Sequence, residues 1–271
     1  MSAKNIHYQT VQLSEYFGNN RQKWDDFYPS EKWIFEQVAG PELSMGKVLD
    51  VGCAAGGLGL ALMERFSVDQ YTGVDINAEV IEIARARKLK AAAAYCEFTC
   101  GDILDIDNLP QEGFDHVVSL SCADWNVETH DIIKKCWRYV RKGGHFILTL
   151  RLTKNDSLFN LPESYQYIYY GNDLPENKEG IEKAPYVVIN YQEAFSLLMD
   201  LKPRPAHIKA YGYWGPPSPT ARTRDDRLVF AALAVRKGTE KDYRIDTGGE
   251  LHLPVDLFYP APPSHVELNE A

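Results

Sequence analysis

Residues 48–62 read VLDVGCAAGGLGLAL, an apolar run followed by a cluster of glycines and a second apolar run. The first run is typical of a buried strand, and the second run predicts a helix. Glycines in the turn between them let the backbone approach a ligand closely, and the N-terminus of the next helix favours a carboxylate or phosphate. The stretch therefore predicts a strand, a nucleotide-binding turn and a helix.

Strand and helix patterns alternate along the rest of the chain. Strands are expected at residues 47–51, 71–76, 97–99, 115–120, 146–152, 208–214 and 228–235, and helices at 58–66, 77–89, 129–140 and 190–201. Asn77 is expected to cap one helix, and Asn190 with Glu193 forms a capping pattern for another. The run Arg141-Lys142-Gly143-Gly144 is expected to end the 129–140 helix. This alternation predicts an α/β fold, with a doubly wound, largely parallel sheet covered by helices on both faces.

The composition divides the chain into three parts. Residues 1–45 are expected to form an N-terminal helical segment, in which Ser30 caps a helix that stops at Gly40-Pro41. Residues 46–237 hold the alternating pattern, which an excursion rich in Tyr, Asn, Pro and Gly interrupts at 153–188. Residues 238–271 show little periodicity, and we expect an extended or partly disordered tail there.

The charge and the apolar runs point to a small-molecule ligand. A formal net charge of −9 and a pI near 5.3 give no general attraction for polyanions, so we expect no nucleic-acid partner. No apolar stretch reaches the roughly 18 to 20 residues needed to cross a bilayer, and the N-terminus has no signal-peptide core. We therefore expect a cytoplasmic protein, monomeric or homodimeric, without a membrane partner.

The cysteine pattern predicts reduced thiols and no metal site. The five cysteines form no CxxC pair, and their odd number suits free thiols. Cys96 and Cys100 lie in one predicted strand, where a spacing of four residues separates them by about 13 Å, too far to share one metal ion.

The glycine turn departs from the fingerprint of a dinucleotide-binding fold. That fingerprint is G-x-G-x-x-G, whereas the only G-x-G here is Gly57-Leu58-Gly59, with no third glycine after it. The mismatch counts against a nicotinamide cofactor. An NAD(P)-dependent oxidoreductase remains an alternative, because it shares the strand, the turn and an acid after the second strand.

Four segments together resemble the class I S-adenosylmethionine-dependent methyltransferases. These are the glycine turn, GVDI at 73–76, TCGDI at 99–103 and FDHVV at 114–118, in the family's order and spacing. The resemblance covers residues 45–152 closely and the rest loosely. It implies a Rossmann-like sheet of seven strands, mostly parallel, whose last strand at 228–235 inserts antiparallel.

The resemblance also implies how S-adenosyl-L-methionine binds as the cofactor. The turn faces the methionine part, Asp75 accepts hydrogen bonds from the ribose hydroxyls, Ile76 packs on the adenine, and Asp102 accepts from the adenine amino group. The implied cofactor-binding residues are Asp50, Gly52, Cys53, Ala54, Gly57, Asp75, Ile76, Asp102, Ile103 and Ser121. A helix cap or a turn aspartate is the alternative for Asp75 and Asp102.

The residues after the fourth predicted strand are expected to face the methyl acceptor. The segment SCADWN at 121–126 lacks the Asn/Asp-Pro-Pro-Tyr signature of methyltransferases that act on planar amino groups. Asp124 and His130 are the candidate catalytic bases, and Trp125 and Asn126 are candidate pocket residues. The alternatives are a turn cap for Asp124, a solvated side chain for His130 and packing for Trp125.

Two other segments are candidates for the acceptor site. An aromatic cluster, Tyr16, Phe17, Trp24, Phe27 and Tyr28, lies in the N-terminal part. Arg21, Trp24 and Tyr28 are candidates for a lid over the ligand, with core packing as the alternative for the aromatics. Arg151 and Arg222, with Arg224 and Arg227, are candidates for an anionic group such as phosphate, with a solvated charge cluster as the alternative.

We therefore expect an S-adenosylmethionine-dependent methyltransferase that acts on a small molecule. Oxygen is the favoured acceptor, on a sugar, a phosphorylated compound or a secondary metabolite. An N-methyltransferase of a small amine is an alternative. So is a non-catalytic cofactor-binding interaction protein, because no residue is an unmistakable base.

Overall fold

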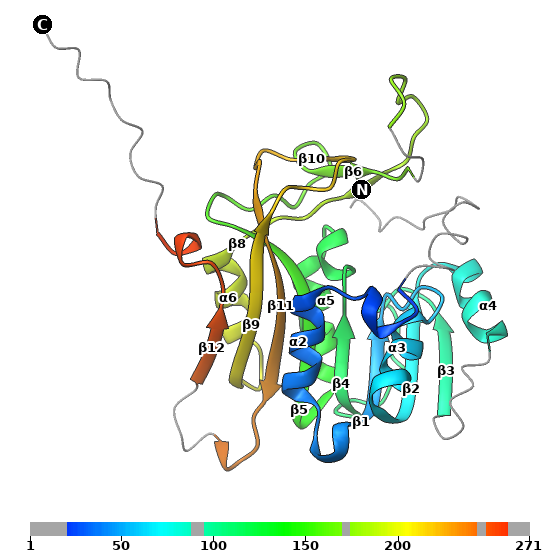
Figure 1. The fold of residues 1–271 in the computed structure, drawn as a ribbon. Coiled ribbons are helices and arrows are strands. Elements are labelled where there is room, and N and C mark those ends of the chain that lie inside the picture. The colour runs from blue at the N-terminus through cyan, green and yellow to red at the C-terminus, as the bar shows by residue number, and fades with distance from the viewer. Residues whose placement is uncertain (1–20, 88–94, 170–173, 243–247, 260–271) are drawn as a thin grey trace, which may run out of the picture.

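The fold is built on one central sheet, shown in Figure 1. The computed structural model describes residues 21–87, 95–169, 174–242 and 248–259. Among these, nine strands join the sheet in the order β12-β9-β11-β5-β4-β1-β2-β3, with β8 beside β5. Their bounds are β1 (Ser44–Val51), β2 (Ser67–Asp75), β3 (Tyr95–Cys100), β4 (Phe114–Ser119), β5 (Val140–Thr153), β8 (Ile189–Asn190), β9 (Pro205–Gly215), β11 (Leu228–Lys237) and β12 (Gly248–His252).

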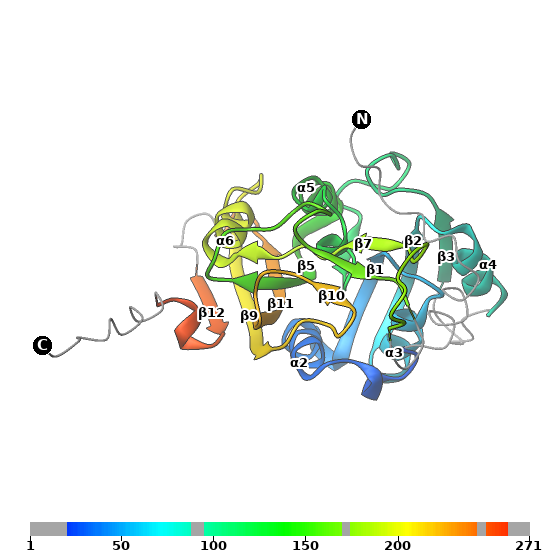
Figure 2. The same ribbon diagram turned by 90° about the horizontal axis from the view of Figure 1, so that it is seen from above.

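Helices cover both faces of this sheet. The α-helices are α2 (Pro29–Val38), α3 (Gly57–Arg65), α4 (Ala78–Ala86), α5 (Thr129–Tyr139) and α6 (Tyr191–Met199), and the short 3-10 helices are η1 (Trp24–Asp26), η2 (Pro41–Leu43), η3 (Ala123–Trp125) and η5 (Val255–Leu257). Figure 2 shows α2 and α3 on one face and α5 and α6 on the other, and each pair belongs to its own hydrophobic cluster. The predicted doubly wound α/β fold is confirmed.

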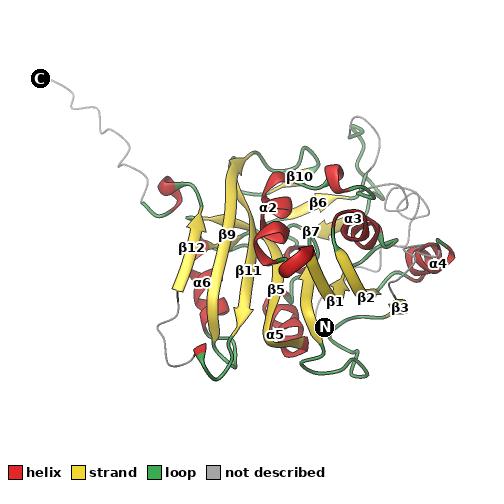
Figure 3. Ribbon diagram, turned by 60° about the horizontal axis from the view of Figure 1, so that its bottom comes forward, coloured by secondary structure: helices red, strands yellow, loops and turns green. Residues whose placement is uncertain are grey.

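The strand pairing confirms the antiparallel insertion near the end of the domain. β11 pairs antiparallel with both β5 and β9, whereas β1 to β5 pair parallel with one another. The expected number of seven strands is exceeded by two. The two-residue β8 pairs with β5, and β12 from the C-terminal part pairs parallel with β9 at the sheet edge, as Figure 3 shows.

Helix α5 buries the face that its sequence pattern predicts. Ile132, Ile133, Cys136 and Trp137 are all buried in the larger hydrophobic cluster. The helix ends at Tyr139, one residue before the predicted end, but the prediction that residues 141–144 cap it is wrong, because they belong to β5. A lysine from another strand supplies the missing cap.

That lysine is Lys237, the last residue of β11. Its buried Nζ donates to the carbonyl oxygens of Trp137 (3.1 Å) and Val140 (2.8 Å), which the end of α5 leaves without helical partners. Glu112 Oε1 lies 3.2 Å from the same nitrogen. A cation at a helix C-terminus also interacts favourably with the helix dipole.

The other helix starts are set by their capping residues. Asn77 Oδ1 accepts from the backbone N–H groups of Glu79 and Val80, as expected. Asn190 caps α6 in the same way. Ser30, by contrast, is not the cap of α2: the N-cap is Tyr28, two residues earlier, and Pro29 occupies the first helical position.

The excursion at 153–188 forms a small sheet above the main one. Strands β6 (Tyr165–Tyr167), β7 (Lys183–Pro185) and β10 (Ala221–Arg222) pair antiparallel in the order β10-β6-β7. Figures 1 and 2 place them over the carboxyl ends of the parallel strands. Within the described ranges, none of the helices has the length and the apolar run that a bilayer crossing needs.

A row of basic side chains crosses the opposite, amino-terminal end of the parallel strands. His116 pairs with His145, which pairs with Arg236. The two imidazole rings stack with centroids 5.4 Å apart. Burial lowers the pKa of His116 to about 4, and burial together with the charges of His116 and Arg236 lowers the pKa of His145 to about 3. Both histidines are therefore neutral in the folded protein at neutral pH.

These histidines make folding less favourable in acid. Between pH 7 and pH 5 both histidines become protonated in the unfolded chain but stay neutral in the native protein. The free energy of unfolding should therefore fall by about 2 kcal/mol per histidine over this range. Urea unfolding of the protein and of the double variant His116→Asn, His145→Asn at both pH values measures this as a difference. Groups that titrate alike in both proteins cancel when the free energy of unfolding of the variant is subtracted from that of the unmodified protein. If this difference does not change with pH, the account is contradicted.

Candidate functional site

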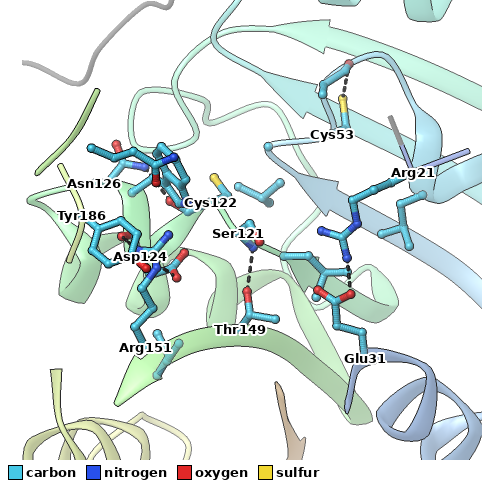
Figure 4. Close-up of a pocket in the computed structure, with 18 of the residues that line it drawn as sticks. Arg21, Glu31, Cys53, Ser121, Cys122, Asp124, Asn126, Thr149, Arg151 and Tyr186 are labelled. Atoms are coloured by element: carbon cyan, nitrogen blue, oxygen red, sulfur yellow. Dashed lines mark hydrogen bonds and ion pairs between the residues drawn. The ribbon is translucent and has the colours of Figure 1, made fainter. Parts of the chain in front are cut away.

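One cavity of about 740 Å³ lies between the glycine turn and the small sheet. Its wall includes the ends of β1, β2 and β5, the loop that follows β4, the start of α2 and residues 166–169 of the small sheet. Figure 4 shows part of this wall, with the Arg21–Glu31 pair on one side and the group around Asp124 on the other. The carboxyl ends of parallel strands are where open α/β sheets bind ligands.

The glycine turn after β1 needs glycine at its first position. Gly52 has a φ of +80°, and a Cβ there would lie 2.6 Å from both Cβ and Sγ of Cys122. The N–H groups of Gly52 and Cys53 both donate to the carbonyl of Val74, at 2.8 and 3.0 Å. The turn is thus bonded to the end of β2, and it leaves backbone open to the cavity.

Asp75, the last residue of β2, is held by two backbone donors. Ala54 N donates to Oδ2 and Asn77 N donates to Oδ1, each at 2.9 Å. Ala54 adopts a φ of +46°, a left-handed conformation that is unfavourable for a residue with a Cβ. Burial raises the pKa of Asp75, and these hydrogen bonds oppose that shift. Each carboxylate oxygen keeps a lone pair for a ligand.

Asp50 is a buried acid at the end of β1. The hydroxyl of Tyr71 donates to its Oδ2. Burial raises the pKa of Asp50 to about 7; the Tyr71 hydrogen bond opposes this shift, the charge of Asp75 adds to it, and the charge of Arg21 opposes it. Asp50 therefore takes up a proton near neutral pH, and a cation bound beside it would favour the ionised form.

Glu31 is a cavity residue that the sequence analysis missed. Its side chain is 1% exposed and forms an ion pair with Arg21, while its Oε2 accepts from Tyr28 N at 2.9 Å. The Arg21 guanidinium also lies over the ring of Phe27, with Cζ 4.4 Å from the centroid. The only signal in the sequence is a glutamate three residues after the N-cap, a pattern that indicates a helix start rather than a ligand.

The opposite side of the cavity holds a buried pair formed by Asp124 and Arg151. Arg151 Nη1 lies 3.2 Å from Asp124 Oδ2 and donates to the carbonyls of Asp124 (2.7 Å) and Val187 (3.3 Å). Its guanidinium stacks on Tyr186, 3.8 Å from the ring centroid. Asp124 Oδ1 is buried and has no hydrogen-bond partner within the described part of the chain. Burial raises the pKa of Asp124, and the charge of Arg151 opposes this.

The structure brings most of the predicted site residues to this cavity. All ten cofactor candidates line it: Asp50, Gly52, Cys53, Ala54, Gly57, Asp75, Ile76, Asp102, Ile103 and Ser121. Of the acceptor-side candidates, Asp124, Arg21, Tyr28, Trp125, Asn126 and Arg151 also line it.

Three candidates lie elsewhere. Trp24 packs edge-on against the rings of Phe35 and Phe66. His130 lies 3.4 Å from Glu193 and packs against Phe159, outside the residues that line the cavity. Arg222 bonds to carbonyls of its own loop. Tyr16 and Phe17 fall outside the described residues.

Comparison with known proteins identifies the domain. Residues 49–148 match the family model described as "Methyltransferase domain". A SAM-dependent methyltransferase from Methanosarcina mazei superposes with a TM-score of 0.54 at 21% identity, over 79% of this chain and 99% of that one. Residues 49–148 therefore match a methyltransferase domain, and the chain has the fold of an S-adenosylmethionine-dependent methyltransferase.

The curated relatives of this chain are named for different substrates. The fatty-acid O-methyltransferase of Mycolicibacterium smegmatis is 32% identical over 38% of this chain and 36% of its own length. A ubiquinone biosynthesis O-methyltransferase of Pseudomonas entomophila is 30% identical over 41% of this chain and 46% of its own. The chain thus spans about half or less of the length of these relatives.

A solved phosphoethanolamine N-methyltransferase shows a ligand in the same fold. The Haemonchus contortus enzyme, in complex with phosphomonomethylethanolamine and S-adenosylhomocysteine, has a TM-score of 0.53 at 14% identity, over 84% of this chain and 57% of that one. At this identity the likeness shows the fold alone.

Because Asp50 has a pKa of about 7 and lines the cavity, ligand affinity should depend on pH. We predict that S-adenosylhomocysteine, whose ammonium group favours an ionised neighbour, binds about tenfold more weakly at pH 6 than at pH 8. Calorimetry at the two pH values measures this. The affinity of the variant Asp50→Asn should not depend on pH in this way. If that variant keeps the same pH dependence, ionisation of Asp50 is not its cause.

Proposed function

We propose that this chain transfers a methyl group from S-adenosylmethionine to a hydroxyl group of a small molecule. The observation that carries the proposal is the free Oδ1 of the buried Asp124, in the same cavity as the glycine turn and Asp75. A buried carboxylate oxygen without a partner costs stability unless a ligand donates to it. The cavity therefore combines a place for the donor with an acceptor for a proton.

The cofactor side of the proposal rests on three chemical features. Asp75 offers two oxygens to the ribose hydroxyls, and its orientation is already set by Ala54 N and Asn77 N. Ile76 and Ile103 line the cavity and offer apolar contact to the adenine. Gly52 lines the cavity, and its lack of a side chain lets the turn pack closely against Cys122 beside the place proposed for the methionine part.

Asp124 is the proposed general base. S-adenosylmethionine, when bound, supplies a methyl group that is electrophilic because it is attached to a positively charged sulfur. Asp124 Oδ1 accepts the proton of the acceptor hydroxyl while the hydroxyl oxygen forms its bond to the methyl carbon; the carbon–sulfur bond breaks and its electrons stay on sulfur. The raised pKa of Asp124 brings it closer to neutral, which suits a general base.

Arg151 is proposed to orient that base. It binds Asp124 Oδ2 and two backbone carbonyls, so Oδ1 is the oxygen left for the substrate. Tyr186 stacks on Arg151 and Trp125 lies nearby, with 5.1 Å between Arg151 Cζ and the Trp125 ring. These rings suit a planar or sugar-like substrate.

Oxygen is the favoured acceptor for two reasons. The two curated relatives named above are both O-methyltransferases. A hydroxyl needs a base to take up its proton, and Asp124 in the cavity wall is the base we propose. The substrate classes we propose remain a sugar, a phosphorylated compound or a secondary metabolite, and the proposed setting is the cytoplasm, as a monomer or homodimer without nucleic acid.

The variant Asp75→Ala tests the cofactor side. Loss of two charge-assisted hydrogen bonds should weaken S-adenosylhomocysteine binding by about 2 to 4 kcal/mol, measured by calorimetry. Asp69→Ala is the matched control, because Asp69 is an exposed aspartate near the other end of the same strand. Equal affinity of the two variants would refute the role of Asp75.

The variant Asp124→Asn tests the acceptor side. It should keep S-adenosylhomocysteine affinity and lower turnover by about 10² to 10⁴-fold, because the amide cannot take up the proton. The assay follows labelled methyl transfer to a panel of alcohols, phenols, sugars and amines. His130→Ala serves as control and should retain full turnover, since His130 lies outside the cavity wall.

Three results would contradict this function. Full activity of Asp124→Asn would exclude Asp124 as the general base. Transfer to amines alone would favour the N-methyltransferase alternative, and tight cofactor binding without transfer to any acceptor would favour a non-catalytic role.

A further inference from the structure

Three cationic side chains surround one tyrosine of the small sheet. Lys178 Nζ lies 5.7 Å, Lys183 Nζ 5.3 Å and Arg222 Cζ 5.9 Å from the centroid of the Tyr167 ring. Lys183 Nζ is also 4.3 Å from the centroid of Tyr165. We call these five residues the cationic patch.

The strand register places the patch on three adjacent strands. Lys183 on β7 lies opposite Tyr167, and Arg222 on β10 lies opposite Tyr165, with both tyrosines on the central strand β6. Residues directly opposite one another, and residues two apart on a strand, share a face of the sheet. The two cations therefore flank the tyrosines from both sides, which is a fixed arrangement rather than a chance approach of loops.

The cations of the patch form no ion pair in the part of the chain that the structure describes. Thirteen ion pairs are formed there, and none includes Lys178, Lys183 or Arg222. Glu176, Glu179 and Glu182 lie in the same segment as the two lysines, but none of them is within ion-pair distance of a patch cation. Attraction to an aromatic ring offsets only part of the repulsion among three like charges.

The patch adjoins the proposed acceptor site. Tyr167 and its neighbour Gln166 line the cavity, and so does Tyr186, which stacks on Arg151. Lys183 and Tyr186 are three residues apart at the end of β7, which corresponds to about 10 Å along an extended chain. Tyr186 in turn contacts Arg151, the partner of the proposed base, so the patch and the base belong to neighbouring parts of one wall.

We propose that the cationic patch binds an anionic group, phosphate or carboxylate, carried by the substrate at the end remote from the hydroxyl that is methylated. This rests on the proposed function only in taking the cavity as the acceptor site. Lys183 and Arg222 supply charge-assisted hydrogen bonds to the anion, and Tyr167 supplies the apolar wall beside it. Arg222 therefore acts with the two lysines, and not with Arg151 as the sequence suggested.

Binding of small aromatic anions tests the proposal without relying on methyl transfer. The full-length protein, saturated with S-adenosylhomocysteine, is titrated in a calorimeter with phenyl phosphate, benzoate and the neutral benzyl alcohol. We expect at least one anion to bind about tenfold or more tightly than benzyl alcohol, with an affinity that falls as salt rises. The comparison of phenyl phosphate with benzoate distinguishes the two kinds of anion.

The double variant Lys183→Gln, Arg222→Gln should lose this preference, with anion affinity reduced about tenfold or more and S-adenosylhomocysteine affinity unchanged. The matched control is Arg65→Gln, Lys134→Gln, which removes the same charge from exposed positions on α3 and α5. If the double variant unfolds, anion affinity is measured on the single variant Lys183→Glu, whose exposed position tolerates the change, and it should also be reduced.

Two results would overturn the proposal that the cationic patch binds an anion. One is that the anions bind no better than benzyl alcohol, and the other is that the patch and control variants have equal anion affinity. Failure of the unmodified protein to bind S-adenosylhomocysteine would instead count against the proposed function. The two failures are therefore distinguishable.

Discussion

The carboxylate of Asp75 is the interaction on which the cofactor side of the cavity depends. Through Ala54 N and Asn77 N it joins the glycine turn after β1 to the start of α4. The bonds from Gly52 and Cys53 to Val74 reinforce the same junction. These contacts stabilise the left-handed conformation of Ala54, which would otherwise cost free energy. Strain of this kind is found where a backbone is shaped for a ligand.

Arg151 plays the corresponding part on the acceptor side. It brings together Asp124 from the loop after β4, Val187 from the excursion and the ring of Tyr186. A buried guanidinium needs several partners to offset its desolvation, and here those partners come from two separate segments, the loop after β4 and the excursion. The geometry of the proposed base is therefore coupled to the docking of the small sheet. Substitutions in β7 should act on turnover even where they contact no substrate.

Much of this arrangement follows from local sequence. The strand, turn and helix at 48–62, the cap at Asn77 and the buried face of α5 obey short-range rules, and all three are present. Because parallel strands end at one edge, residues that follow successive strands were expected to meet, and the ten cofactor candidates do line one cavity.

Other features depend on contacts between distant segments, which short-range patterns do not carry. Glu31 looked like part of a helix start, and Tyr186 lay in a segment without periodicity, yet both reach the cavity. His130 shares the sequence neighbourhood of Asp124 but is turned toward Glu193. β12 has too little apolar character to predict a strand, and it forms because β9 offers a free edge.

A crystal structure of the protein with bound S-adenosylhomocysteine tests the central claim most directly, which is that one cavity holds both the methyl donor and the base. The account predicts the ribose hydroxyls within hydrogen-bond distance of both oxygens of Asp75. It also predicts the sulfur facing open space that leads to Asp124 Oδ1. A ligand bound elsewhere, or a sulfur separated from Asp124 by protein atoms, would contradict it.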